Sequence, residues 1–360
     1  MRPRTMAATL FAICIAATSA MAQPFEIRTV VAQFNGESEL GRSVATILSL
    51  QLWQTLRKHP TPNPKRLDFG DGKVLWLGQE AIARTHIGAS RASRQAMAQA
   101  ILWGNVRIFD ADALVTAYLT IPKGFDFRTK KHEIWEVLLN RNNARRTLKV
   151  DIPQRAYTFE PIILPQEFVT KYRTPDSLAI LSSPSKIGGR IGTIGQTYRR
   201  IANSGEYARV QSGGVSGWVY LPQLGLNRPE IVDFVAGIIR IFRGDWNGAR
   251  ESFEKVVANA SIPASVRADS LLYIIRARSE LQQVAEAEIE AVLKLAPASR
   301  RAVQYAVMHR LIACNTKDLQ QADCTKRERA SVELLTRTHA LFPPEDPWLK
   351  TVASILPLRR

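Results

Sequence analysis

The spacing of apolar residues changes along the chain, and each change predicts a different kind of element. An apolar, β-branched run near the start is typical of a strand, and the stretch after it has apolar residues at helical spacing. The expected strands span 27–34, 73–77, 102–109 and 113–121, and the expected helices span 38–58 and 90–101. This order, β-α-β-α-β-β, predicts an α/β domain over 25–165, with extra short strands toward its end.

The region 176–224 has a much shorter period. Brief apolar-alternating runs are separated by glycines, which supply turns. The expected strands lie at 177–181, 190–194, 197–202, 207–211 and 217–220. So many short strands in so few residues cannot form a layered sandwich, but they can close a small β-barrel that hides its edges.

The region 229–345 repeats a helical pattern. After the turn at Gly244-Asp245-Trp246, a small residue, a large apolar residue and an apolar pair follow in phase, and the same pattern recurs once more. The two sets are Ala249, Phe253, Val256 and Val257, and Ala285, Ile289, Val292 and Leu293. Pro263 and Pro297 close the units, and a third unit is expected over 300–343. The whole chain is therefore predicted to be a multidomain α+β protein.

The N-terminus has the anatomy of an export signal. Arg2 and Arg4 precede an apolar run over 6–17, and a small-x-small pattern ends at Ala22, before Gln23. We expect a signal peptide over 1–22 and a periplasmic or secreted protein. The apolar run is shorter than the roughly 20 residues of a membrane span, and no second long run follows, so no transmembrane helix is expected.

Export leaves two cysteines, Cys314 and Cys324, because Cys14 lies in the leader. In an oxidising compartment these two have one intramolecular pairing, and a disulfide is expected. Two unpaired thiols are the alternative. A metal site is less favoured, because only His309 lies nearby in the sequence.

The charge is strongly basic, with 49 Lys and Arg against 32 Asp and Glu and a formal net charge of +17. The excess is spread along the chain, which suits weak attraction to acidic glycans, wall polymers or anionic lipid headgroups. Nucleic acid is disfavoured as a partner, because export argues against it and no helix carries a dense basic stripe.

No constellation of residues predicts catalysis. The histidines are scattered and the cysteines are expected to pair, so the protein is not expected to be an enzyme or to need a cofactor or metal. His86 is expected in a loop before the second helix, and Asp110 and Asp112 in a hairpin turn. The histidines are His59, His86, His132, His309 and His339. Trp53, Trp76 and Trp103 are expected in the core.

The first domain resembles the amino-terminal domain of the TolB translocation protein family, and the curli-secretion lipoprotein family shares its strand–helix pattern. The resemblance rests on the strand ending in Gln33-Phe34, the long helix, and the run AILWGNV over 100–106. The usual proline before the phenylalanine is replaced by Gln33. The resemblance implies a domain for protein–protein contact in the envelope and no enzymatic activity.

The central region resembles the bacterial SH3-like domain. The motifs are Ser183-Pro184-Ser185, IGTI over 191–194, YARV over 207–210, and Gly217-Trp218-Val219. Leu181 stands where the family usually has arginine. Such domains bind peptidoglycan peptides or proline-rich segments, or act as spacers. Trp218 is a candidate ligand contact but is more simply a core residue; the better ligand candidates are Tyr198, Tyr207 and Tyr220.

The helical region resembles tetratricopeptide repeats, whose period is about 34 residues. Gly237 falls at the family's first-helix glycine, and Tyr273 takes that place in the second unit. The concave face of such an array usually receives a peptide or partner helix, and Arg240 and Arg276 are candidates to line it. The alternative is a packed helical support.

These features together predict an exported, non-enzymatic cell-envelope adaptor that binds peptidoglycan or a partner protein or peptide. A cell-wall hydrolase or an accessory to one is the enzymatic alternative. A secretion or outer-membrane assembly subunit is a third.

Overall fold

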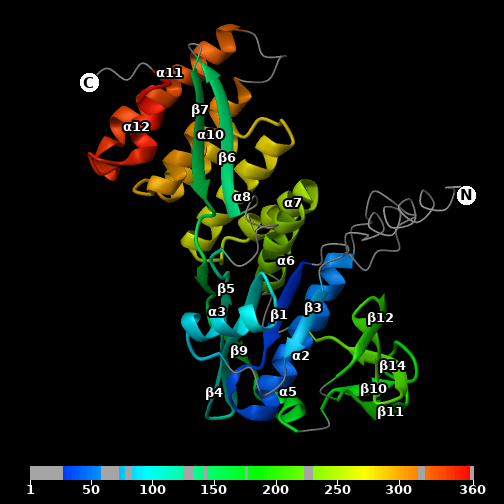
Figure 1. The fold of residues 1–360 in the computed structure, drawn as a ribbon. Helices are drawn as coiled ribbons and strands as arrows, with labels where there is room; N and C mark the ends of the chain where they lie inside the picture. The colour runs from blue at the N-terminus through cyan, green and yellow to red at the C-terminus, as the bar shows by residue number, and fades with distance from the viewer. Residues whose placement is uncertain are drawn as a thin grey trace, which may run out of the picture.

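The computed structural model describes residues 27–57, 73–77, 83–124, 133–141, 144–174, 177–195, 197–222, 230–314 and 321–356. They form a mixed α/β structure with a seven-stranded sheet, a five-stranded sheet, a two-stranded hairpin and a set of C-terminal helices (Figure 1). The expected signal peptide, with Ala22 and Gln23, lies outside the described residues. None of the described helices is long and apolar enough to cross a membrane.

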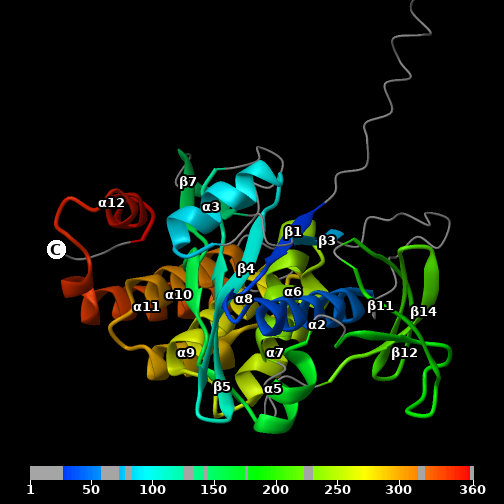
Figure 2. The ribbon, with the colours of Figure 1, turned by 90° about the horizontal axis from the view of Figure 1, so that it is seen from below.

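The N-terminal part follows the predicted order of strands and helices. Its parallel strands β1 (Arg28–Ala32), β3 (Lys73–Leu77) and β4 (Ala100–Phe109) are joined by β5 (Asp112–Thr120), which is antiparallel to β4. The short strands β2 (Asn35–Gly36), β8 (Ala156–Thr158) and β9 (Ile162–Leu164) complete the sheet. The helices α2 (Ser38–Arg57) and α3 (His86–Gln95) cover opposite faces (Figure 2).

Alternation along β1 explains the two covered faces. Val31 belongs to the large apolar cluster that contains α2, whereas Val30 and Ala32 pack with Ala89 of α3. Successive side chains of a strand point to opposite sides, so an unbroken apolar strand needs a helix on each side.

Helix α3 does not have the bounds predicted for it. It begins at His86, where the Thr85 hydroxyl accepts from the Gly88 amide at 3.1 Å, and it ends at Gln95. Met97 then has a φ of 49°, which breaks the helix, and Ala100 and Ile101 enter β4. The prediction of a loop at His86 is therefore wrong, because it missed the threonine cap. The turn predicted at Asp110 is confirmed, whereas Asp112, predicted in the same turn, is the first residue of β5.

The five strands predicted in the central region are all present. They are β10 (Ala179–Leu181), β11 (Arg190–Thr193), β12 (Arg199–Ser204), β13 (Tyr207–Ser212) and β14 (Val215–Tyr220). Every pairing is antiparallel, and the strand order is β11-β10-β14-β13-β12. Helix α5 (Gln166–Tyr172) leads into this sheet from the N-terminal part.

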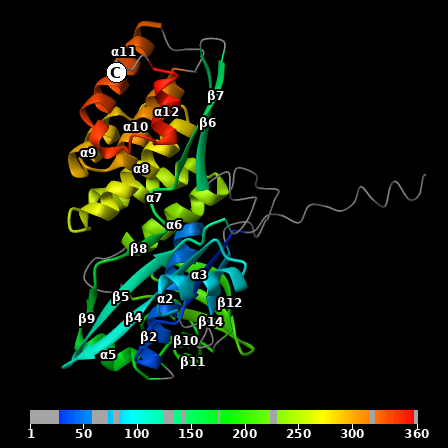
Figure 3. The ribbon, with the colours of Figure 1, turned by 60° about the vertical axis from the view of Figure 1, so that its left-hand side comes forward.

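The hairpin of β6 (Ile134–Arg141) and β7 (Ala144–Asp151) packs with the C-terminal helices, although its sequence lies within 25–165 (Figure 3). One face buries Trp135, Leu139 and Leu148 in the same apolar cluster as α10. The Trp135 ring lies 5.1 Å from that of Tyr305.

The C-terminal helices follow one another as three consecutive pairs. They are α6 (Glu230–Arg243) with α7 (Trp246–Ala258), α8 (Ala264–Glu280) with α9 (Glu286–Leu295), and α10 (Arg300–Ala313) with α11 (Gln321–Arg337). A 3-10 turn, η2 (His339–Leu341), and α12 (Pro347–Ala353) follow.

Gly237 of α6 packs closely against Phe253 of α7. A Cβ there would lie 2.7 Å from the Phe253 ring, so this position requires glycine. Phe253 also stacks on Tyr273 of the next helix pair at 4.8 Å. Gly237 and Tyr273, which hold the same place in the two units, therefore both contact Phe253 in the core.

A single apolar cluster joins the main parts of the molecule. It contains Val44 of α2, Val210 of β13 and Phe234 of α6, and it extends to Ile274 of α8. The N-terminal sheet, the five-stranded sheet and the first helices therefore share one core.

Candidate functional site

Strands β13 and β14 carry aromatic side chains on their outer face. Ala208, Val210 and Val219 are buried in the shared core. Because side chains alternate along a strand, Tyr207, Trp218 and Tyr220 point the other way. Tyr207 is paired with Tyr220 in the register, and Arg209 is paired with Trp218, so these four side chains are neighbours.

Helix α5 extends this surface. Lys171 Nζ lies 5.5 Å from the centre of the Tyr220 ring and 5.2 Å from that of Tyr172. The Tyr207 and Tyr220 rings lie 5.4 Å apart, and the Arg209 guanidinium lies 6.0 Å from the Trp218 ring. We call Tyr172, Tyr207, Trp218 and Tyr220, with Lys171 and Arg209, the aromatic face.

The aromatic face is only partly covered. Trp218 and Tyr220 are half-buried, Lys171 and Arg209 are exposed, and Tyr207 is 8 % exposed. Tyr172 is buried at the base of this face, where it belongs to the shared core. Trp218 is not a member of the apolar core clusters, so its interpretation as a core residue is wrong. The reason is alternation: Val219 occupies the inward position on β14.

The hydroxyls of Tyr172 and Tyr220 stay protonated at neutral pH. Burial, followed by the nearby Tyr220, raises the pKa of Tyr172 to about 12. Burial raises the pKa of Tyr220 as well, and Glu206 and Tyr207 add to the shift. Each phenol can therefore donate and accept a hydrogen bond, beside two cations and apolar ring faces.

Tyr198 lies apart from the other candidates. Its side chain packs against the shared core, and its hydroxyl donates to Ser49 Oγ of α2 at 3.4 Å. Burial raises the pKa of Tyr198. The structure therefore brings together three of the four aromatic candidates and uses Tyr198 to hold the five-stranded sheet against α2.

Arg240 and Arg276 do not line an open groove, since each is only 1 % exposed. Arg240 donates to the Thr55 carbonyl of α2 at 2.9 Å, to the Gly248 carbonyl at 3.2 Å, and to Ser252 Oγ. Burial lowers its pKa, and Asp245 opposes the shift. The Arg276 guanidinium lies 5.5 Å from the Trp246 ring. Both arginines hold elements together.

His86 is part of a hydrogen-bonded aromatic cluster. Its Nδ1 lies 2.7 Å from Thr120 Oγ1, which also accepts from Trp103 Nε1 at 2.9 Å. Trp103 stacks on Tyr118 at 4.4 Å. Thr120 is buried and its hydroxyl already has two partners, so this pair does not present a free nucleophile.

His309 is paired with Ser279, and this pair is also structural. His309 Nδ1 lies 2.6 Å from Ser279 Oγ, which donates to the Ile275 carbonyl at 2.9 Å. His309 Nε2 accepts from the Ala285 amide at 3.2 Å. With both ring nitrogens occupied, the imidazole cannot act as a general base. Burial lowers its pKa to about 4.

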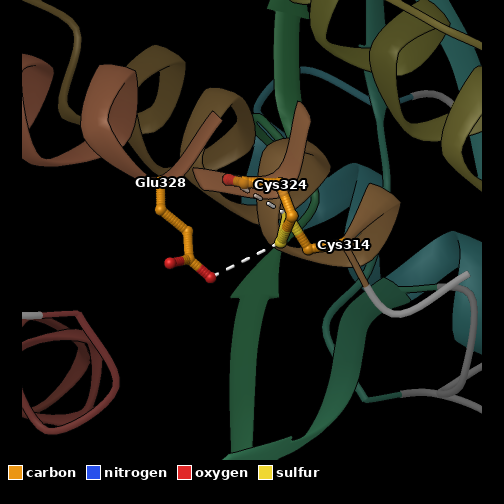
Figure 4. Close-up of side chains that lie close together, drawn as sticks. All are labelled: Cys314, Cys324 and Glu328. Atoms are coloured by element: carbon orange, nitrogen blue, oxygen red, sulfur yellow. Dashed lines mark hydrogen bonds between the residues drawn. A yellow bond between two sulfur atoms is a disulfide. The ribbon is translucent and has the colours of Figure 1, made fainter. Parts of the chain in front are cut away.

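The two cysteines form the expected disulfide between α10 and α11 (Figure 4). Their Cα atoms are 5.1 Å apart, within the usual range. Glu328 Oε1 lies 3.6 Å from Cys324 Sγ, so Cys314, Cys324 and Glu328 are the described groups that a metal ion could use. Both sulfurs are bonded to each other, which removes them as thiolate ligands. Sequence reasoning missed Glu328, although it lies one helical turn after Cys324.

A polar cavity of about 650 Å³ lies at the carboxyl end of β1. Gln33, Asn35, Ser38, Arg84 and Asn105 line it. Asn35 Nδ2 donates to the Ala83 carbonyl at 2.6 Å, which ties this end of β1 to the start of α3. Gln33 is buried and donates to the Ser38 carbonyl at 3.0 Å.

Comparisons with known proteins add no relative: no protein family, curated protein or solved structure matches this chain.

Proposed function

We propose that this protein is an exported, non-enzymatic adaptor of the cell envelope that binds peptidoglycan through the aromatic face. The observation that carries the proposal is the grouping of Tyr207, Trp218 and Tyr220 with two exposed cations on one side of the sheet. The export signal, the SH3-like motifs and the repeat-like helix pairs support the same function.

The chemistry of the aromatic face suits an amphiphilic, acidic polymer. Ring faces contact the apolar faces of sugars or peptide side chains, and phenol hydroxyls bond their polar groups. Lys171 and Arg209 pair with carboxylates, which peptidoglycan carries on its stem peptides. The excess of Lys and Arg over Asp and Glu, which persists without Arg2 and Arg4 of the expected signal peptide, adds long-range attraction to the same polymer.

Co-sedimentation of the full chain with insoluble peptidoglycan tests the proposal. Trp218→Ala and Tyr220→Ala are each expected to weaken binding about tenfold, the loss of one partly buried aromatic contact. Arg209→Gln is expected to weaken it less and to flatten its salt dependence. Phe109→Ala is the matched control, because Phe109 is 49 % exposed on β4, in the N-terminal sheet.

Three results would refute the proposal: no sedimentation of the wild type, equal losses in the control, or no loss in the aromatic variants. A clearing band in zymography on purified wall would favour the hydrolase alternative. A partner protein recovered by the wild type, and lost in Trp218→Ala, would assign the aromatic face to a partner protein.

A further inference from the structure

A second pocket, of about 670 Å³, lies between the β6–β7 hairpin and helices α10 and α12. One wall is the strand β7, through the consecutive residues 147–151, with Ile134 of β6 beside it. The opposite wall is made by residues of both helices: Arg300, Arg301, Gln304, Pro347, Trp348 and Thr351. The sequence patterns contained no signal for this pocket, because its walls are distant in the chain.

The charge lining the pocket is mainly positive. Lys149, Arg300 and Arg301 are its cations, and Asp151 is the one carboxylate among the lining residues. Arg300 pairs with Asp346, which caps α12 by accepting from the Leu349 amide at 2.9 Å. Lys149 Nζ lies 3.1 Å from Glu136 Oε2, which is outside the lining, and Arg301 donates to the Asp151 carbonyl at 3.2 Å. Three cations against one carboxylate in the lining itself favour an anionic ligand.

Trp348 provides a hydrogen-bond donor that has no partner. Its side chain is 7 % exposed and stacks on Phe342 at 5.6 Å, while its indole Nε1 has no hydrogen-bond acceptor within the described residues. Buried donors without partners are rare in folded proteins, because they lose their bond to water and gain none. A ligand with an acceptor oxygen would supply the missing bond.

Strand β7 offers a free edge along the same pocket. In the described part of the chain its only strand partner is β6. On the pocket side, the Asp151 carbonyl accepts from Arg301 at 3.2 Å and from the Tyr305 hydroxyl at 3.3 Å. An extended peptide can add to such an edge by backbone hydrogen bonds, while its side chains enter neighbouring pockets.

We propose that this pocket binds an extended peptide that carries a carboxylate. The peptide backbone lies along β7, and the carboxylate accepts from the Trp348 indole between Lys149 and Arg301. Val150 and Pro347 contact an apolar side chain of the peptide. This site lies in the C-terminal part of the molecule, and the proposal does not depend on the binding of peptidoglycan by the aromatic face.

Fluorescence anisotropy of labelled peptides with the full chain tests the proposal. The probes are an amino-terminally labelled Gly-Val-Val-Glu with a free carboxyl end, its carboxyl-terminal amide, and the same peptide with glutamine in place of glutamate. The free acid is expected to bind below about 1 mM. Weaker binding of the amide would assign the site to a terminal carboxylate, and weaker binding of the glutamine peptide to an acidic side chain. Equal binding of all three probes, or of none, would overturn the proposal.

Two variants place the binding in the pocket. Trp348→Phe keeps the stacked ring and removes the indole N–H, so binding is expected to weaken about tenfold while thermal stability is unchanged or higher. Lys149→Gln, on an exposed strand position, is expected to weaken binding several-fold and to reduce its salt dependence. Lys350→Gln is the matched control, since Lys350 lies on α12 outside the lining. Unchanged affinity in both pocket variants would contradict the assignment.

Discussion

Replacing Arg240 with methionine should destabilise the protein strongly, because its guanidinium joins α6, α7 and α2. The side chain is buried, donates to the Thr55 carbonyl at 2.9 Å and to the Gly248 carbonyl at 3.2 Å, and lies 3.8 Å from Asp245. Methionine fills the space but leaves both carbonyls without this donor and removes the cation beside Asp245, whose carboxylate keeps the Gly248 amide as a donor at 3.0 Å. Each lost bond to a charged group costs about 1.5–3 kcal/mol, and removing the buried charge offsets part of that sum. We expect the free energy of unfolding to fall by about 3–5 kcal/mol.

Urea unfolding followed by circular dichroism measures this loss. Arg240→Lys keeps the charge without the planar fork and is expected to fall between wild type and Arg240→Met. Lys255→Met is the control, because Lys255 on α7 is exposed and pairs with Asp233 only at 3.8 Å, an interaction worth about 0–1 kcal/mol. A loss below about 1 kcal/mol for Arg240→Met would show that the buried charge does not hold these helices together.

The remaining predictions concern pH and the disulfide. His309 has a pKa of about 4 in the folded state against 6.5 ordinarily, so its contribution to the free energy of unfolding is complete above pH 6.5 and is lost as the pH falls toward 4. His309→Gln should therefore make the free energy of unfolding depend less on pH across this range. An unchanged pH dependence would contradict the shift. Burial raises the pKa of Asp269 from 3.8 to about 7, although the nearby Arg301 opposes the shift. The contribution of Asp269 to the free energy of unfolding is therefore complete below pH 3.8 and is lost as the pH rises through 7. Asp269→Asn should therefore raise stability at pH 8 by about 2–3 kcal/mol, after discounting for its half-buried side chain, and no gain in thermal unfolding at pH 8 would refute this. The double variant Cys314→Ser with Cys324→Ser should lose about 2–3 kcal/mol in urea unfolding without reductant, and the same loss should follow reduction of the wild type.

The sequence predicted most of the regular elements because their signals are local. Apolar spacing located α2, and glycine-separated alternation located all five strands of the central sheet. The same local information misplaced α3, since the Thr85 cap and the positive φ of Met97 set its ends. A careful count of alternation along β14 would have placed Trp218 on the outer face opposite Val219.

Long-range packing explains what the sequence could not show. Arg240 is flanked by apolar residues on α6, but its burial depends on an acceptor at Thr55, which is distant in the chain. The β6–β7 hairpin follows the N-terminal sheet in sequence, yet its apolar face matches α10 and not that sheet. No periodicity within a segment reports which distant surface will cover it.

The shared core determines how the two proposed sites can work together. The aromatic face belongs to a sheet that is fastened to α2, where Gln51 donates to the Pro222 carbonyl at 2.8 Å. The N-terminal sheet is fastened to the helices in turn, through the Tyr157 and Tyr273 hydroxyls 3.2 Å apart and through a continuous apolar cluster. The two sites therefore sit on packed elements and not on separate domains joined by free linkers. A ligand that reaches both gains affinity only if its own length matches their separation, whereas two short ligands should bind independently. Occupying the β7 pocket with the acidic peptide should consequently leave peptidoglycan binding unchanged, and competition between the two would mean that one surface takes both ligands.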